Sequence, residues 1–146
     1  MKVGRIIGIL GGILTMVGIV LPWLTVTGTL VVGGSVTISG FNLFGILVMI
    51  FAIVGLILVA IGGRGTSIGA MVMGIIAFVL MLIAFGALSW IAGSYLGTVT
   101  ISVGIGVYLS LIGTLILIIG SAMAFVDAGK AKTAPPPMAG VPPPVQ

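Results

Sequence analysis

Four long apolar runs, none with an ionisable residue in its interior, constrain the fold more than any other feature of this sequence. The hydrocarbon core of a bilayer is about 30 Å thick, and a helix needs about 20 apolar residues to cross it. The runs have about this length, so we predict transmembrane helices at residues 4–21, 43–62, 68–88 and 104–125. The absence of charge within them favours spanning helices over the buried core helices of a soluble protein.

The composition also indicates an integral membrane protein. Of the 146 residues, 60% are hydrophobic and 4% are charged, whereas soluble domains carry about 25% charged residues. The chain has no His, Cys or Glu and a single acid, Asp127. The missing side chains hold most zinc, iron–sulfur and haem sites and perform most acid–base catalysis. We therefore expect a protein that is not an enzyme and has no metal, no cofactor and no nucleic-acid partner.

The basic residues predict how the helices are oriented. With four spans, both termini and the link at 62–67 lie on one side, and all basic residues fall there, while loops 22–42 and 89–103 carry no charge. The positive-inside rule then predicts cytoplasmic termini and two uncharged external loops. The topology-setting residues are Lys2, Arg5, Arg64, Lys130 and Lys132.

The chain around the first and second spans supports two further expectations. No small-residue cleavage site follows the first span, so we expect an uncleaved helix rather than a signal peptide. Glycines and hydroxyls in the 62–67 link break the helix, and Ser67 is a candidate cap for the next one.

Both external loops contain segments with the period of a β-strand. Hydroxyl residues alternate with apolar, β-branched residues at 25–32, 35–39 and 98–102, a pattern typical of half-buried strands. Gly33-Gly34 fits a two-residue hairpin turn. We predict an all-α membrane fold, a four-transmembrane-helix bundle with a small external antiparallel β-sheet built from the 1–2 and 3–4 loops. Its Thr/Ser face would meet water, and its Val/Ile face would lie on the bundle or on a partner.

Small residues recur at helical spacing in the first and fourth spans. Because lipid supplies no hydrophobic drive between helices, such residues mark places where helices approach closely. The contacts could lie inside one bundle, or between the bundle and a second copy or a larger partner. The predicted helix-packing residues are Gly4, Gly8, Gly12, Gly106, Ser110, Gly113 and Gly120.

Aromatic side chains stand near the outer ends of the predicted spans. Tryptophan and tyrosine are enriched at membrane–water interfaces, so we expect Trp23, Trp90, Tyr95 and Tyr108 to be interface anchors. Asn42, at the start of the second span, is a candidate helix cap or an outer ligand-binding amide.

The composition changes after the predicted membrane domain, residues 1–125. Residues 126–146 form a polar, Pro-rich segment that we expect to be a cytoplasmic tail. Two Pro triplets favour extended polyproline II, either as a disordered tail or as a docking peptide for an aromatic groove of a cytoplasmic partner. The docking residues would be Pro135, Pro136, Pro137, Pro142, Pro143 and Pro144.

Three segments resemble those of small uncharacterised four-span membrane proteins of bacteria and archaea. They are Leu21-Pro22-Trp23, the strand and glycine at 35–41, and the Gly-x-Gly-x-Tyr-Leu start of the fourth span within 103–113. The resemblance covers most of residues 4–125 and implies no activity. The chain is more distantly similar to claudin-type tetraspans, but it lacks their cysteine pair and Gly-Leu-Trp motif.

These features predict a structural role. We expect a non-catalytic accessory or structural tetraspan that contacts the lipid bilayer and packs against other membrane proteins or itself, as a complex subunit or an envelope component. The alternative is a binder or transporter of a lipid-like or quinone-like hydrophobic ligand. That alternative needs a path or pocket at membrane depth, for which the spans offer few polar residues.

Overall fold

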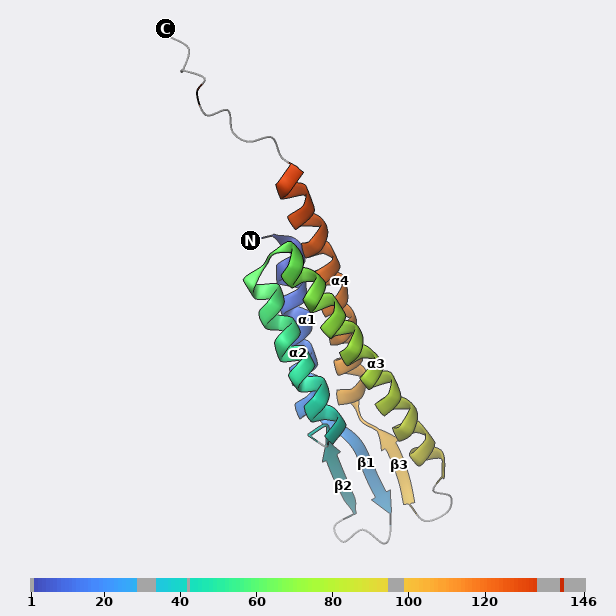
Figure 1. The fold of residues 1–146 in the computed structure, drawn as a ribbon. Helices are drawn as coiled ribbons and strands as arrows, with labels where there is room; N and C mark the ends of the chain where they lie inside the picture. The colour runs from blue at the N-terminus through green and yellow to red at the C-terminus, as the bar shows by residue number, and fades with distance from the viewer. Residues whose placement is uncertain (1, 29–33, 42, 95–98, 134–139, 141–146) are drawn as a thin grey trace.

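The computed structural model describes residues 2–28, 34–41, 43–94, 99–133 and 140, with residues 43 and 92–94 described by their backbone alone. Within these ranges the chain is mostly helical and carries a small sheet (Figure 1). The elements in order are α1 (Val3–Val20), β1 (Pro22–Gly28), β2 (Ser35–Ser39), α2 (Leu43–Ile61), α3 (Arg64–Ser94), β3 (Val99–Val103) and α4 (Ile105–Thr133). The described part thus has four helices that are long and apolar enough to cross a membrane, as predicted.

The first two helices agree with their predicted ranges, while α3 and α4 are longer. α3 begins at Arg64 and has 31 residues, and α4 continues to Thr133 through the segment that was predicted to be tail. Ser67 therefore lies buried inside α3 and does not cap it. Between α2 and α3, only Gly62 and Gly63 are not helical, and Gly62 has a φ of +66°. A positive φ is accessible to glycine at little cost.

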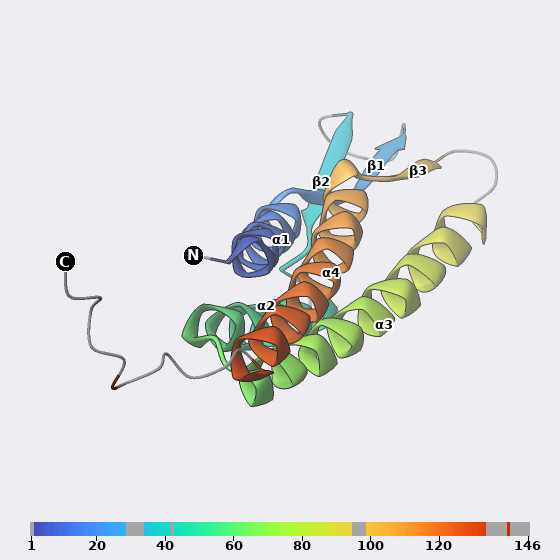
Figure 2. The same ribbon diagram turned by 90° about the horizontal axis from the view of Figure 1, so that it is seen from above.

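The four helices form a ring in which each contacts its neighbours in the chain, and α1 and α4 close the ring with the most extensive contact. The sheet lies at one end of the bundle (Figure 1). The start of α1, the α2–α3 link and the end of α4 lie at the other end. Seen from above, α3 diverges from α1 towards the sheet end (Figure 2).

The sheet has the order β2-β1-β3 and is antiparallel throughout, which confirms a sheet built from both loops. β1 begins at Pro22, earlier than predicted, and the residues described stop at 28, so the predicted turn residue Gly33 lies outside them. The register places like residues opposite each other: Val26 pairs with Val36 and Ile101, and Thr25 pairs with Thr37 and Ser102. One face is therefore hydroxylated and mostly exposed.

The apolar face of the sheet is covered only near the bundle. Leu24 is buried beside the helices, while Val36, at the far end, is exposed. The predicted division between a Thr/Ser face and a Val/Ile face is thus present in the register, but the bundle covers only part of the apolar face.

Candidate functional site

Small residues of α1 and α4 form a continuous contact, which we call the glycine seam. The two helices run antiparallel, since Gly4 faces Ala124 at one end and Gly18 faces Ser110 at the other. Along each helix the spacing alternates between four and three residues, the heptad pattern of helices that pack along a common line. The seam consists of Gly4, Gly8, Gly11, Thr15 and Gly18 on α1 and Gly106, Ser110, Gly113, Leu117, Gly120 and Ala124 on α4. Leu117 is the one large residue among them, and its backbone meets Gly11.

The backbones in the glycine seam approach too closely for any side chain at several positions. A Cβ atom added at Gly113 would lie 2.5 Å from the amide nitrogen of Thr15, and one at Gly120 would collide with the backbone of Gly8. The hydroxyl of Ser110 donates a hydrogen bond across the seam to the carbonyl oxygen of Thr15 at 3.4 Å. The seam therefore depends on backbone approach, the mode of packing that small residues permit.

The predicted packing residues divide between two neighbours of α1. Most of them lie in the glycine seam, but Gly12 faces Leu56 of α2, and Gly8 touches both Val59 of α2 and the seam. Gly11 and Gly18, which were not predicted, complete the α1 side. A template of glycines four apart selects Gly12, whereas the alternating spacing of four and three selects Gly11 and Gly18. The structure uses these residues for contacts inside one chain.

Apart from Ser110, two further buried hydroxyl groups bond to the backbone of their own helix. Thr15 donates to the Gly11 carbonyl at 2.9 Å, and Ser121 donates to the Leu117 carbonyl at 2.7 Å. Among the described residues, no buried side-chain nitrogen or oxygen lacks a hydrogen-bond partner. The hydrogen-bonding needs of these hydroxyls are therefore met within the bundle.

Trp23 lies in the core rather than at an interface, which differs from its expected role as an anchor. The register of β1 against β2 shifts between Pro22 and Leu24, and this irregularity turns the indole ring into the bundle, where it is 5% exposed. Its N–H donates to the carbonyl oxygen of Gly18 at 3.0 Å. A bulge reorients a side chain in this way, and an alternating pattern alone does not reveal it.

The other aromatic residues predicted to be anchors are placed differently. Trp90 is 75% exposed near the end of α3. Tyr108 is 50% exposed, and its ring packs edge-on against Phe85 with centroids 5.8 Å apart. Both positions suit an interface. Tyr95 and Asn42 lie outside the described residues, as do the Pro triplets of the tail.

A small apolar cavity of about 150 Å³ lies beside the Trp23 ring. Its walls come from β1, the start of α2 and the second half of α3, and none of them is ionisable. Because the Trp23 N–H already bonds to Gly18, the cavity offers a hydrocarbon-like lining. The lining residues are Trp23, Phe44, Ala84, Ala87, Leu88 and Ile91.

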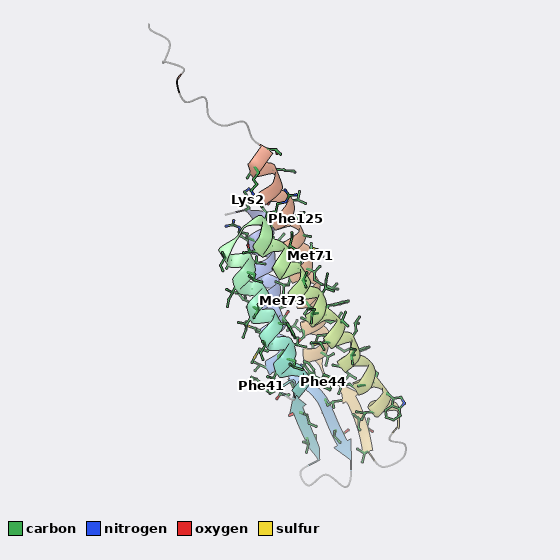
Figure 3. The ribbon with its side chains drawn as sticks, in the orientation of Figure 1. Lys2, Phe41, Phe44, Met71, Met73 and Phe125 are labelled. Atoms are coloured by element: carbon green, nitrogen blue, oxygen red, sulfur yellow. The ribbon has the colours of Figure 1, made fainter. Side chains whose placement is uncertain are left out.

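At the opposite end lie three basic side chains, two of which contact α4, and we call Lys2, Arg5 and Arg64 the basic collar. The Lys2 ammonium donates to the carbonyl oxygen of Asp127 at 2.9 Å. The guanidinium carbon of Arg64 lies 5.0 Å from the centre of the Phe125 ring, a cation–π contact. The Arg5 guanidinium lies against Gly62. Figure 3 shows Lys2 and Phe125 at this end and Phe41 and Phe44 at the other.

Within the part of the chain that the structure describes, no group of three His, Cys, Asp or Glu side chains could hold a metal ion. No known protein family matches the chain, and no curated protein shows significant similarity to it.

Proposed function

We propose that this chain is an integral membrane protein whose four helices span the bilayer. Large aliphatic side chains cover the outside of the helices, while glycine, alanine, serine and threonine fill much of the inside. In water the opposite arrangement is stable, because burial of large apolar side chains drives folding. Between membrane helices that drive is absent, and small residues at the contacts are favoured.

The orientation that we propose has both termini in the cytoplasm and the sheet outside. The basic residues gather at the end of the bundle opposite the sheet, and the positive-inside rule assigns that end to the cytoplasm.

Within the membrane, the function that we propose is a non-catalytic one: an accessory or structural tetraspan that packs against another membrane protein or a second copy. The observation that carries it is the exposed flank on the last turns of α3. Ile83 and Trp90 are exposed there, and a Cβ at Gly86 would meet no atom within 4 Å. Small residues beside large ones on an outer face allow a partner helix to approach closely.

Cysteine crosslinking tests this function, because the chain has no cysteine of its own. We expect Gly86→Cys, labelled with a maleimide that carries a photoreactive benzophenone and irradiated in native membranes, to form a defined adduct with a second protein or copy. The matched control is Ile119→Cys, on the exposed face of α4. No adduct from either position, together with a lone protomer in native mass spectrometry, would contradict the accessory role.

The second candidate function is binding of a lipid-like or quinone-like molecule, and the apolar cavity beside Trp23 favours it. This function predicts a stoichiometric small molecule on a lone protomer in native mass spectrometry. Ala87→Phe would fill the cavity and remove that molecule. Ala60→Phe, at an exposed position on α2, is the matched control and would leave it bound.

A further inference from the structure

The basic collar brings together charges that are far apart in the sequence. Lys2 directly precedes α1, Arg5 lies in its first turn, and Arg64 begins α3. Lys2 and Arg64 nevertheless both contact α4, at Asp127 and Phe125 respectively. These contacts place the three cations at the level where α1 begins, α2 ends and α3 begins.

The positive charge at this end is largely uncompensated. The chain has five basic residues and a single acid, Asp127, for a net charge of +4. Lys130 and Lys132 lie on the last turns of α4, just beyond the basic collar. Since one carboxylate can offset one charge at most, this end attracts anions.

At the same level, the surface of α4 changes from apolar to charged within two turns. A shallow hollow of about 330 Å³ is lined by Ala122, Met123 and Val126 on its apolar side and by Asp127 and Lys130 on its polar side. Lys130 and Asp127 offset each other in the hollow, so the excess of positive charge beside it comes from the basic collar, where Lys2 and Arg64 contact Asp127 and Phe125. An apolar surface next to an excess of positive charge matches the two parts of a phospholipid, an acyl chain and a phosphate headgroup.

We infer that the basic collar binds the headgroups of anionic phospholipids, with an acyl chain lying in the hollow on α4. The inference rests on the proposed membrane location. Arginine presents a planar fork of donors that suits phosphate. The contact with Phe125 restricts the Arg64 side chain, so less conformational freedom is lost when phosphate binds.

Native mass spectrometry of the full chain with mixed lipids tests the inference. The protein is purified in detergent with equal amounts of phosphatidylglycerol and phosphatidylcholine, and the lipids retained on each protomer are compared. We expect preferential retention of phosphatidylglycerol that weakens as salt rises, because exposed charges are screened. Equal retention of the two lipids at low salt would overturn the inference, and this comparison needs no variant.

Variants separate the basic collar from net charge alone. Arg64→Gln is expected to reduce the preference about fivefold, the effect of one basic side chain near an anionic surface. Arg64→Lys keeps the charge but loses the planar fork of donors, so it should reduce the preference by less than Arg64→Gln does. Lys132→Gln, an equal change of charge beyond the collar, should also reduce it less than Arg64→Gln. Equal losses in Arg64→Gln and Lys132→Gln would overturn the assignment to the collar.

Two controls distinguish the remaining outcomes. Inorganic phosphate at constant ionic strength is expected not to displace the lipid, because it cannot occupy the hollow, and efficient displacement would overturn the assignment to a lipid. Flotation of the protein with vesicles tests membrane insertion by itself. A protein that does not float contradicts the proposed function, whereas one that floats without any lipid preference contradicts only this inference.

Discussion

Glycine at single positions decides how closely α1 and α4 approach each other. Gly113 and Gly120 stand where a Cβ would meet the backbone of α1, so no rotamer change can relieve the contact. Small-residue spacing in the sequence was enough to select Gly106, Ser110, Gly113 and Gly120 on α4, but not Leu117 and Ala124. It was not enough for α1, because both Gly11 and Gly12 are small and only the alternating spacing shows which one faces α4.

Substitution in the glycine seam is expected to destabilise the bundle. In Gly120→Ala, the new methyl group would collide with the Gly8 backbone, so the helices must move apart. Overpacking of this kind costs about 1–3 kcal/mol. Unfolding in mixed micelles, followed by circular dichroism, measures the loss. Gly86→Ala, where a Cβ meets nothing within 4 Å, should be unchanged or up to about 1 kcal/mol more stable. Equal stability of the two variants would contradict the close approach at Gly120.

The two tryptophans are expected to differ in their contact with lipid. Trp23 is buried and Trp90 is exposed. In vesicles containing brominated lipid, which quenches indole fluorescence on contact, the Trp90→Phe protein retains only Trp23 and should be weakly quenched. The Trp23→Phe protein should be strongly quenched. Strong quenching of Trp23 would place its ring at the interface, as the sequence alone suggested.

At the scale of helices and strands, hydropathy predicts where a helix crosses a membrane but not where it ends. α1 and α2 stop near the limits of their apolar runs. α3 continues through 89–94 and α4 through 126–133. Neither segment contains a proline, and the residues of both are compatible with a helix. The strands were predictable because alternation of hydroxyl and apolar residues sets both the strand and its two faces. The irregularity at Trp23 leaves no mark in that pattern.

The register of the sheet predicts which cysteine pairs crosslink. Val26 and Ile101 lie directly opposite each other in β1 and β3, and such pairs have Cβ atoms about 4.5–5.5 Å apart. A Val26→Cys/Ile101→Cys protein should react with a short bifunctional thiol reagent, so that the two fragments stay joined after trypsin cleaves at Arg64. Val26→Cys/Thr100→Cys should react poorly, since Thr100 belongs to the opposite face. Better crosslinking of the second pair would show a register shifted by one residue.

At the scale of the whole molecule, the two ends of the bundle differ in chemistry. One end carries the basic residues, and the other carries a sheet without ionisable side chains. The sequence was sufficient to predict this polarity, because in a chain with four spans both termini and the middle loop lie on the same side. It did not show that α1 and α4 are neighbours, since contacts between distant segments depend on how small residues match in space.

Thiol labelling of intact cells tests the orientation of the bundle. We expect a membrane-impermeant maleimide to react with Ser35→Cys, in β2, before lysis. Gly65→Cys and Thr133→Cys, at the other end of the bundle, should react only after lysis. Reaction of Ser35→Cys and Gly65→Cys on the same side would contradict four spans with cytoplasmic termini.

The contact between the first and last helices has a consequence for biosynthesis. Thr15 meets Ser110, which follows it by 95 residues. Ribosomes add about 5–20 residues per second, so α1 waits roughly 5–20 s for its partner. During that interval its glycine face is open to any other small-residue helix being inserted nearby. Chains truncated before α4 would therefore keep α1 available for mispairing and become substrates for membrane quality control.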